Sequence, residues 1–310
     1  MTQKRESIVP PRLRAGDCVR LVSPASTPTP EWVAKITATL ENLGLVVQCG
    51  AHVLDEWGYM AGRDEDRLAD INEAFRDPQV KAVITTRGGK GAYRIADKLD
   101  FESIRKHPKL LLGFSEITIL HLALWKHCGL ASVHGAVWDE SFGSQTALSF
   151  RRSILSNEPV IITAQNNEPT AGLTTDGTAK GILLGGNQDM IATAAGWGLP
   201  SLEGAILLLE DVDKRLGFID RQLTMLQNGG HLKDIAGVAV GQYEQCGADD
   251  TTQGTWTAID VLRDRLGSLN VPILGGLPLG HGKNPRAVPI GTRAVLDTAA
   301  KTLTVDAGVR

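Results

Sequence analysis

The sequence predicts an α/β protein of two domains, a parallel-sheet domain followed by a mixed α+β domain. In the first half of the 310-residue chain, short apolar strands alternate with single amphipathic helices. Strands separated in this way form a parallel sheet with helices on both faces. A polar, turn-rich stretch then interrupts the pattern, and short strands with glycines between them follow. We expect an N-terminal domain over residues 1–163, a linker over 164–177 and a C-terminal domain over 178–310.

The N-terminal elements follow from hydrophobic periodicity and from the placement of glycine and proline. The helix predicted over residues 31–43 carries Val33, Ile36 and Leu40 on one face, and Gly44 is placed to end it. The other predicted helices cover 64–76 and 92–99, and the predicted strands cover 18–23, 45–49, 82–86, 110–112 and 131–134. Parallel sheets of this kind bind ligands at the carboxyl ends of their strands.

The C-terminal elements are shorter and less regular, which favours a mixed α+β domain. A helix over residues 215–226 places Leu216, Ile219 and Leu223 on one face, and a second helix is predicted over 256–266. The predicted strands cover 179–184, 205–209, 235–240, 272–274, 294–296 and 303–305.

Composition excludes several function classes. The chain has 32 basic and 35 acidic residues and a formal net charge of −3, so it lacks the basic surface of a nucleic-acid-binding protein. Its four cysteines show no CxxC spacing, so we expect no zinc site, no redox pair and no cofactor. Residues 1–14 are polar, and no apolar run approaches the roughly 20 residues of a membrane span. We expect a cytoplasmic protein without a membrane partner.

Ser115 is placed as a nucleophile would be. A buried strand leads into a turn that contains Gly113, the serine follows two residues after that glycine, and an apolar helix comes next. A hydroxyl at a helix N-terminus meets free N–H groups and the positive end of the helix dipole, and both stabilise negative charge. The nucleophile elbow of α/β-hydrolases uses the same device, although Ile117 stands where that elbow has its second glycine. The alternative is an ordinary N-cap serine.

A glycine-rich loop follows the strand over residues 82–86. Gly88, Gly89 and Gly91 can present backbone N–H groups to an anion, or can form a turn shaped only by packing. If this strand lies beside the strand that leads to Ser115, the loop and the N–H of Glu116 can form an oxyanion hole.

Two residues of the second half could complete an acyl-transfer site. Glu210 ends an apolar strand, where a carboxylate can orient a histidine; alternatively Glu210, Asp211 and Asp213 cap the next helix. His281 lies between two glycines in a tight loop, where an imidazole is placed to move protons. His134, at the end of a strand, is the second candidate base.

Several segments together resemble the LD-carboxypeptidase family of serine peptidases, which includes the microcin C self-immunity peptidases. The segments follow the family's order, cover nearly the whole chain and comprise residues 16–25, 87–91, 113–118, 134–135, 184–187, 208–211, 219–221 and 279–282. The resemblance implies a flavodoxin-like or amidotransferase-like N-terminal domain. It also implies a mixed, β-rich, swivelling C-terminal domain and a homodimer.

The resemblance also implies the roles of the site residues. Ser115 is the nucleophile, His281 the general base and then acid, and Glu210 the orienting carboxylate. Backbone N–H groups of Gly88, Gly89 and Glu116 form the oxyanion hole.

The chain departs from the family pattern at three positions. Glu116 replaces the usual aspartate, Lys90 a frequent tyrosine and Ala136 a frequent proline. Lys90 could add a cation near the site or point to solvent. Arg87 could grip the substrate's carboxylate or form a structural salt bridge.

The resemblance leaves the substrate open between two small molecules. The family's reference activity removes the terminal D-alanine of murein tetrapeptide, at an L,D-amide bond, in cell-wall recycling. The immunity branch instead cleaves the amide of peptidyl or aminoacyl nucleotides and stacks an aromatic on the base. Trp138, Trp197 and Trp256 are candidates for that stacking, but we expect each to pack in the core. A catalytically silent peptide-binding protein is a third hypothesis.

Overall fold

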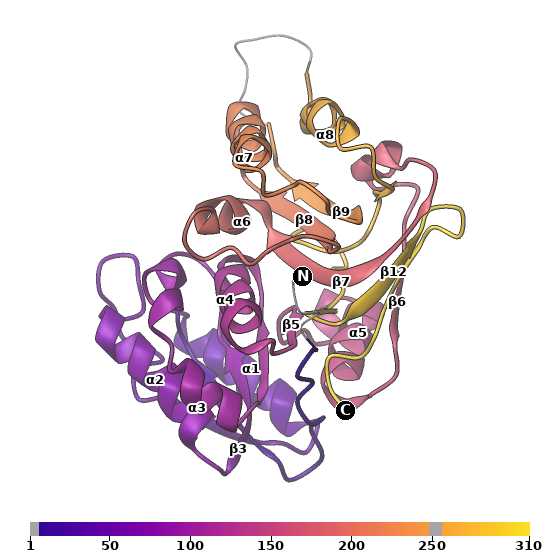
Figure 1. The fold of residues 1–310 in the computed structure, drawn as a ribbon. Helices are drawn as coiled ribbons and strands as arrows, with labels where there is room; N and C mark the ends of the chain where they lie inside the picture. The colour runs from indigo at the N-terminus through magenta and orange to yellow at the C-terminus, as the bar shows by residue number, and fades with distance from the viewer. Residues whose placement is uncertain (1–5, 248–255) are drawn as a thin grey trace.

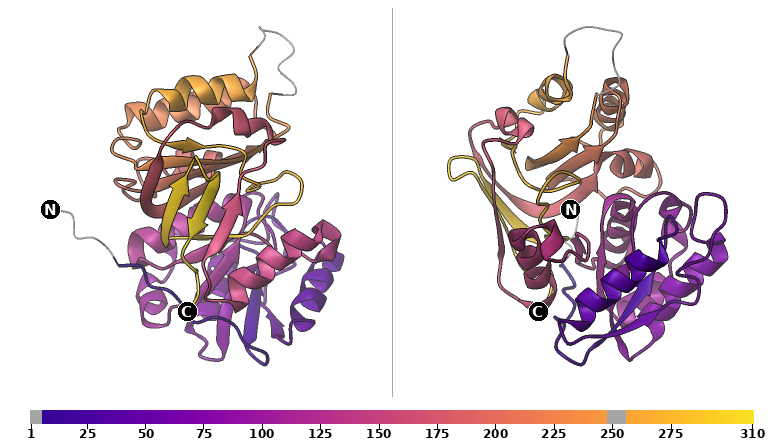
Figure 2. Two further views of the ribbon diagram at one scale, coloured as in Figure 1. Left: turned by 90° about the vertical axis from the view of Figure 1, so that its right-hand side faces the viewer. Right: turned by 180° about the vertical axis from the view of Figure 1, so that it is seen from behind.

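A computed structural model describes residues 6–247 and 256–310, so the first five residues of the polar start lie outside it (Figure 1). The described chain forms two units, each built around one sheet, and Figure 2 shows them from two further sides. Within these residues, no helix is both long enough and apolar enough to cross a membrane.

The first sheet has the strand order β11-β5-β4-β3-β1-β2. Its strands are β1 (Cys18–Val22), β2 (Val46–Cys49), β3 (Val80–Thr85), β4 (Leu110–Gly113), β5 (Ser132–His134) and β11 (Val288–Ile290). Strands β1 to β5 pair in parallel, and β11 pairs antiparallel with β5. The order of β1 to β5 is that of a flavodoxin-like sheet, which confirms the predicted parallel domain. The loops that follow β1, β3, β4 and β5 therefore meet at one edge.

Helices cover both faces of this sheet, because alternate strand residues point to opposite sides. Ala82 and Ile84 of β3 share a core with α1 (Pro30–Glu41) and α5 (Ser144–Leu155). Val83 belongs to the other core, to which three further helices of this unit contribute. Those three are α2 (Asp64–Arg76), α3 (Phe101–Lys106) and α4 (Thr118–Cys128). The predicted bounds of α2 are confirmed.

The second sheet has the order β10-β9-β8-β7-β12-β13-β6. Its strands are β6 (Val160–Thr163), β7 (Thr178–Asn187), β8 (Ile206–Val212), β9 (Gly237–Glu244), β10 (Ile273–Leu274), β12 (Arg293–Asp297) and β13 (Thr302–Val305). Strands β7 to β10 are parallel and the rest antiparallel, so the mixed character predicted for this domain is confirmed. Its helices are α6 (Gln188–Ala194), α7 (Leu216–Asn228) and α8 (Ala258–Gly267).

The helix predicted over residues 92–99 is wrong. The segment forms two 3-10 turns, η1 (Ala92–Arg94) and η2 (Ala96–Lys98). Its backbone bonds span three residues instead of four, as from Ile95 N to Ala92 O. A contact from outside the segment also holds its first turn, since a carboxylate oxygen of Glu116 accepts from the N–H of Ala92.

Sheet membership departs from the predicted domain boundaries in two places. Strand β6 belongs to the second sheet although it precedes residue 164, and β11 of the C-terminal half completes the first sheet. The segment 164–177 is packed and not free: it contains the 3-10 turn η5 (Pro169–Leu173), in which buried Thr170 donates to Gly241 O. Long-range pairing decides these memberships, and periodicity along the chain does not record it. The domain boundaries themselves stay a prediction.

Candidate active site

Ser115 lies in a sharp, strained turn at the carboxyl edge of the first sheet. Its φ is +64°, in the left-handed region that costs a non-glycine residue energy. The turn leads into the 3-10 turn η3 (Ser115–Ile117), and α4 begins only at Thr118 with Ile117 as its N-cap residue. Ser115 is therefore not the N-cap of that helix, and the ordinary capping alternative is wrong. The half-buried serine therefore lies in a strained turn, as the nucleophile does in the nucleophile elbow of α/β-hydrolases.

The glycine-rich loop lies directly against this turn. Strands β3 and β4 are neighbours, with Ile84 paired to Leu112, as the oxyanion-hole hypothesis requires. A Cβ on Gly88 would lie 2.8 Å from Ser115 Cβ and 3.0 Å from the carbonyl oxygen of Phe114, so only glycine fits there. Within the described residues, no protein acceptor is assigned to the N–H of Gly88 or Gly89.

Ser26, in the loop after β1, holds the glycine-rich loop from the other side. Its Oγ accepts from the N–H of Lys90 at 3.0 Å, and its N–H donates to Gly88 O at 3.3 Å. Sequence analysis missed this residue, because a serine in a Ser/Thr/Pro loop gives no local signal of such a long-range contact.

His281 and Glu210 form a hydrogen-bonded pair. Nδ1 of His281 lies 2.7 Å from Oε2 of Glu210, whose side chain is fully buried, whereas the imidazole is 18% exposed. The register of β8 against β9 shifts between Leu209 and Asp211, and such a bulge re-aims the side chain of the residue it contains. A Cβ on Gly280 would lie 3.0 Å from Oε2 of Glu210, so the loop needs glycine to bring His281 this close.

Phe114 joins this pair to the serine turn. It precedes Ser115, and its ring centroid lies 4.4 Å from that of His281. The histidine of the second unit therefore lies beside the serine turn of the first. Because Nδ1 faces the carboxylate, Nε2 is left to exchange a proton with a hydroxyl.

His134, the second candidate base, is buried behind the pair. Its Nε2 lies 3.9 Å from Oε1 of Glu210, beyond hydrogen-bond distance. Burial, with smaller effects of His121 and His281, holds its pKa well below the ordinary value. A fully buried, neutral imidazole cannot reach substrate, so the geometry favours His281.

Sequence analysis gave His121 no role. Its Nε2 lies 3.0 Å from the carbonyl oxygen of Gly113, and burial lowers its pKa to about 4. Neutral imidazole therefore packs beneath the serine turn.

The capping alternative for the acidic cluster is wrong. Helix α7 begins at Leu216 with Arg215 as its N-cap residue and without a side-chain cap hydrogen bond. Asp211 is buried in β8, where its Oδ1 accepts from Asn187 Nδ2 at 3.0 Å. Burial, and then the neighbouring Glu210, raise its pKa to about 7. Glu210 and Asp211 therefore belong to the buried strand, and Asp213 is exposed just after it.

The two candidate substrate-binding cations are exposed. Arg87 Nη1 lies 3.5 Å from the carbonyl oxygen of Thr27, and Lys90 presents its side chain to solvent. Their substrate-binding role stays a prediction.

The three tryptophans differ in their environment. Trp138 packs in the core and meets Phe114 at 5.8 Å between ring centroids, as expected. Trp197 and Trp256 are 40% and 56% exposed, so core packing is wrong for both.

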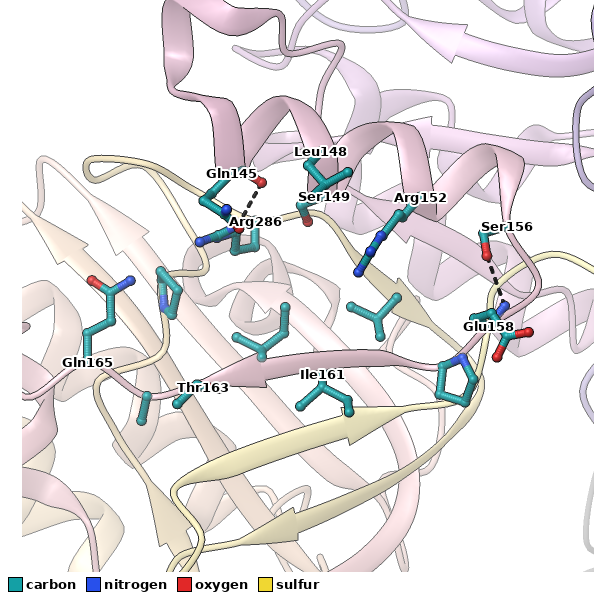
Figure 3. Close-up of a pocket in the computed structure, with 15 residues that line it drawn as sticks. Gln145, Leu148, Ser149, Arg152, Ser156, Glu158, Ile161, Thr163, Gln165 and Arg286 are labelled. Atoms are coloured by element: carbon teal, nitrogen blue, oxygen red, sulfur yellow. Dashed lines mark hydrogen bonds between the residues drawn. The ribbon is translucent and has the colours of Figure 1, made fainter.

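A cavity of about 550 Å³ lies between α5 and β6 (Figure 3). Its lining includes Arg152, Ile161 and Arg286, and Arg286 donates to Gln145 O at 2.6 Å. None of the candidate catalytic side chains lines it.

The chain matches the family models of both LD-carboxypeptidase domains, the N-terminal over residues 19–135 and the C-terminal over 180–296. It is 37% identical to a probable murein peptide carboxypeptidase of Bacillus subtilis, over 97% of this chain and 95% of that one. It is 29% identical to the murein tetrapeptide carboxypeptidase of Pseudomonas aeruginosa, over 90% and 92%. The fold superposes with a TM-score of 0.83 on microcin C7 self-immunity protein MccF in complex with aspartyl sulfamoyl adenosine, at 20% identity, over 96% of this chain and 98% of that one.

Proposed function

The chain belongs to the LD-carboxypeptidase family of serine peptidases, and from that premise we propose that it releases the terminal D-alanine of murein tetrapeptide in cell-wall recycling. One observation carries the proposal: the His281–Glu210 pair lies beside the strained Ser115 turn, joined to it by Phe114. The similarity to murein peptide carboxypeptidases over nearly the whole chain supports the same substrate.

In the proposed mechanism, Ser115 attacks the carbonyl of the L,D-amide while Nε2 of His281 takes the hydroxyl proton. Glu210 holds Nδ1–H and stabilises the imidazolium that forms. The oxyanion binds to the backbone N–H groups of Gly88, Gly89 and Glu116. His281 then gives the proton to the leaving D-alanine amine, and water hydrolyses the acyl-enzyme by the same route in reverse.

Arg87 and Lys90 are the proposed partners of the substrate's terminal carboxylate. Both are exposed cations in or beside the loop that carries the proposed oxyanion donors. A cation there can fix the carboxylate of the departing D-alanine.

Two substrates, each incubated with wild-type protein and with Ser115→Ala, test the proposal by mass spectrometry. Loss of one alanine from murein tetrapeptide, dependent on Ser115, is the expected result. Cleavage of aspartyl sulfamoyl adenosine alone would move the chain to the immunity activity, which the MccF-like fold keeps as the second candidate. Binding of the tetrapeptide without turnover would instead favour a silent peptide-binding protein.

The homodimer implied by the resemblance and the cytoplasmic location expected from the polar start and the lack of a long apolar run are further parts of this proposal. Light scattering coupled to gel filtration tests the first, with twice the chain mass as the expected result. Fractionation of cells that produce the protein tests the second.

A further inference from the structure

Glu116 has a buried side chain that the proposed mechanism does not use. Its backbone N–H is a proposed oxyanion donor, but its carboxylate points to the glycine-rich loop. The residue as a whole is only 3% exposed. Oε1 accepts from the N–H of Ala92 at 2.5 Å. Ala92 begins η1, directly after the loop that contains Gly88 and Gly89.

The glycine-rich loop is therefore anchored on both sides. Ser26 holds Gly88 and Lys90 on the side of β1, and Glu116 holds the far end of the loop on the side of the serine turn. Gly91, between the anchors, has φ +127°, and a Cβ there would lie 2.7 Å from Nη1 of Arg67. A loop with several glycines is flexible on its own, so these side-chain anchors have a positional effect.

We propose that the Glu116 carboxylate is a positioning residue, which holds the Gly88 and Gly89 N–H groups at the oxyanion position only while it is ionised. The inference rests on the proposed function. It adds a proton-sensitive group that lies outside the proposed triad. The device acts through the loop, since Glu116 contacts its backbone and not the substrate.

The surroundings of the carboxylate place its titration within reach of ordinary pH. Burial raises the pKa of Glu116 to about 7, while hydrogen bonds from the backbone of Ala92, Gly91 and Tyr93 act in the opposite direction. Above that pH the ionised carboxylate accepts these N–H groups. Below that pH, one carboxyl oxygen carries a proton and becomes a donor that faces backbone N–H donors. The loop then loses part of its anchor.

Charged groups from two neighbouring elements act on this carboxylate. Arg67, fully buried on α2, faces it and lowers its pKa, and Asp64 pairs with both Arg67 and Arg94. Tyr93 of η1 is the other titratable neighbour; Glu116 contributes to its raised pKa.

The test compares Glu116→Gln and Glu116→Ala with the wild type in turnover of murein tetrapeptide. For Glu116→Ala we expect kcat to fall on the order of tenfold to a hundredfold with little change in KM, because a misplaced donor acts on the transition state. Glu116→Gln keeps an accepting oxygen, so its kcat at pH of about 8 should lie between that of Glu116→Ala and that of the wild type.

The pH profile separates a positioning role from a purely structural one. Between about pH 5 and about pH 9, protonation of Glu116 should make the low-pH limb of log kcat/KM steeper in the wild type than in Glu116→Gln. Asp70→Asn is the matched control, since Asp70 is a buried carboxylate that accepts from His52 N at 3.0 Å and has a pKa raised by burial. It should keep the wild-type profile.

Two results would overturn the inference: an unchanged slope in Glu116→Gln, or a change confined to KM. If Glu116→Ala fails to fold, the Gln variant decides alone. Ser115→Ala in the same assay separates the two proposals, because turnover by Ser115→Ala contradicts the proposed function itself. If Ser115→Ala shows no turnover and Glu116→Gln keeps the wild-type slope, only this inference is contradicted.

Discussion

Nδ1 of His281 lies 2.7 Å from Oε2 of Glu210, although 70 residues separate the two in the chain. The carboxylate comes from the bulge in β8 and the imidazole from the loop between β10 and β11. The contact sets the proton on Nδ1 and leaves Nε2 free, which is the state that a general base needs.

Replacement of Glu210 by glutamine should lower kcat by about 10⁴ and leave the fold intact, because the amide favours the wrong tautomer of His281. Steady-state hydrolysis of murein tetrapeptide measures the loss. Asp213→Asn is the control, since Asp213 is exposed, lies three residues away and has a φ of +52° that asparagine tolerates. An active Glu210→Gln enzyme would exclude the pair from the mechanism.

The strain at Ser115 should be measurable as stability. Ser115→Ala keeps a Cβ at φ +64°, whereas Ser115→Gly removes it. The free energy of unfolding, measured with denaturant, should therefore be higher in Ser115→Gly than in Ser115→Ala by roughly 1 kcal/mol. Both variants should lack turnover. Equal stability of the two would mean that the turn relaxes in solution.

Gly88→Ala should damage catalysis more than folding. The new Cβ would meet Ser115 Cβ at 2.8 Å, so loop and serine must separate, and a shift near 1 Å costs about a hundredfold in rate. Gly267→Ala, at the end of α8, meets nothing within 4 Å and serves as control. Kinetics and thermal unfolding on both variants test this, and wild-type kcat in Gly88→Ala would remove the loop from the oxyanion site.

Glu116 should make stability depend on pH. The pKa of its carboxyl is raised in the fold from 4.5 to about 7, so its contribution is fully present below about pH 4.5 and is lost as pH rises through about 7. Relative to Glu116→Gln, the wild type should lose about 3 kcal/mol of unfolding free energy over that window. Urea unfolding at a series of pH values measures it; a constant difference between the two proteins would contradict the burial of the charge.

What the sequence could predict was local. The period of apolar residues defined α2 to the residue, and the strand–turn order around Gly113 and Ser115 made Ser115 the candidate nucleophile. Long-range contacts were not predictable from periodicity. The pairing of β11 with β5 and the grip of Ser26 on the loop join segments far apart in the chain. The 3-10 turns after Gly91 were not predicted for the same reason, because their first residue is held by Glu116, which lies in another element.

The candidate triad was predicted by family resemblance more than by pattern. Spacing alone left Glu210 a plausible helix cap and His134 an open alternative to His281. Burial separates the two histidines, because His134 is enclosed and His281 reaches solvent. Burial of this kind depends on two domains meeting, which no local window of sequence records.

The most direct test is the initial rate of D-alanine release from murein tetrapeptide by the wild type, by Ser115→Ala and by His281→Ala. We predict steady release by the wild type and none above background by either variant, with all three equally folded by circular dichroism. Substantial release by Ser115→Ala would show that another group attacks the amide and would contradict the proposed mechanism.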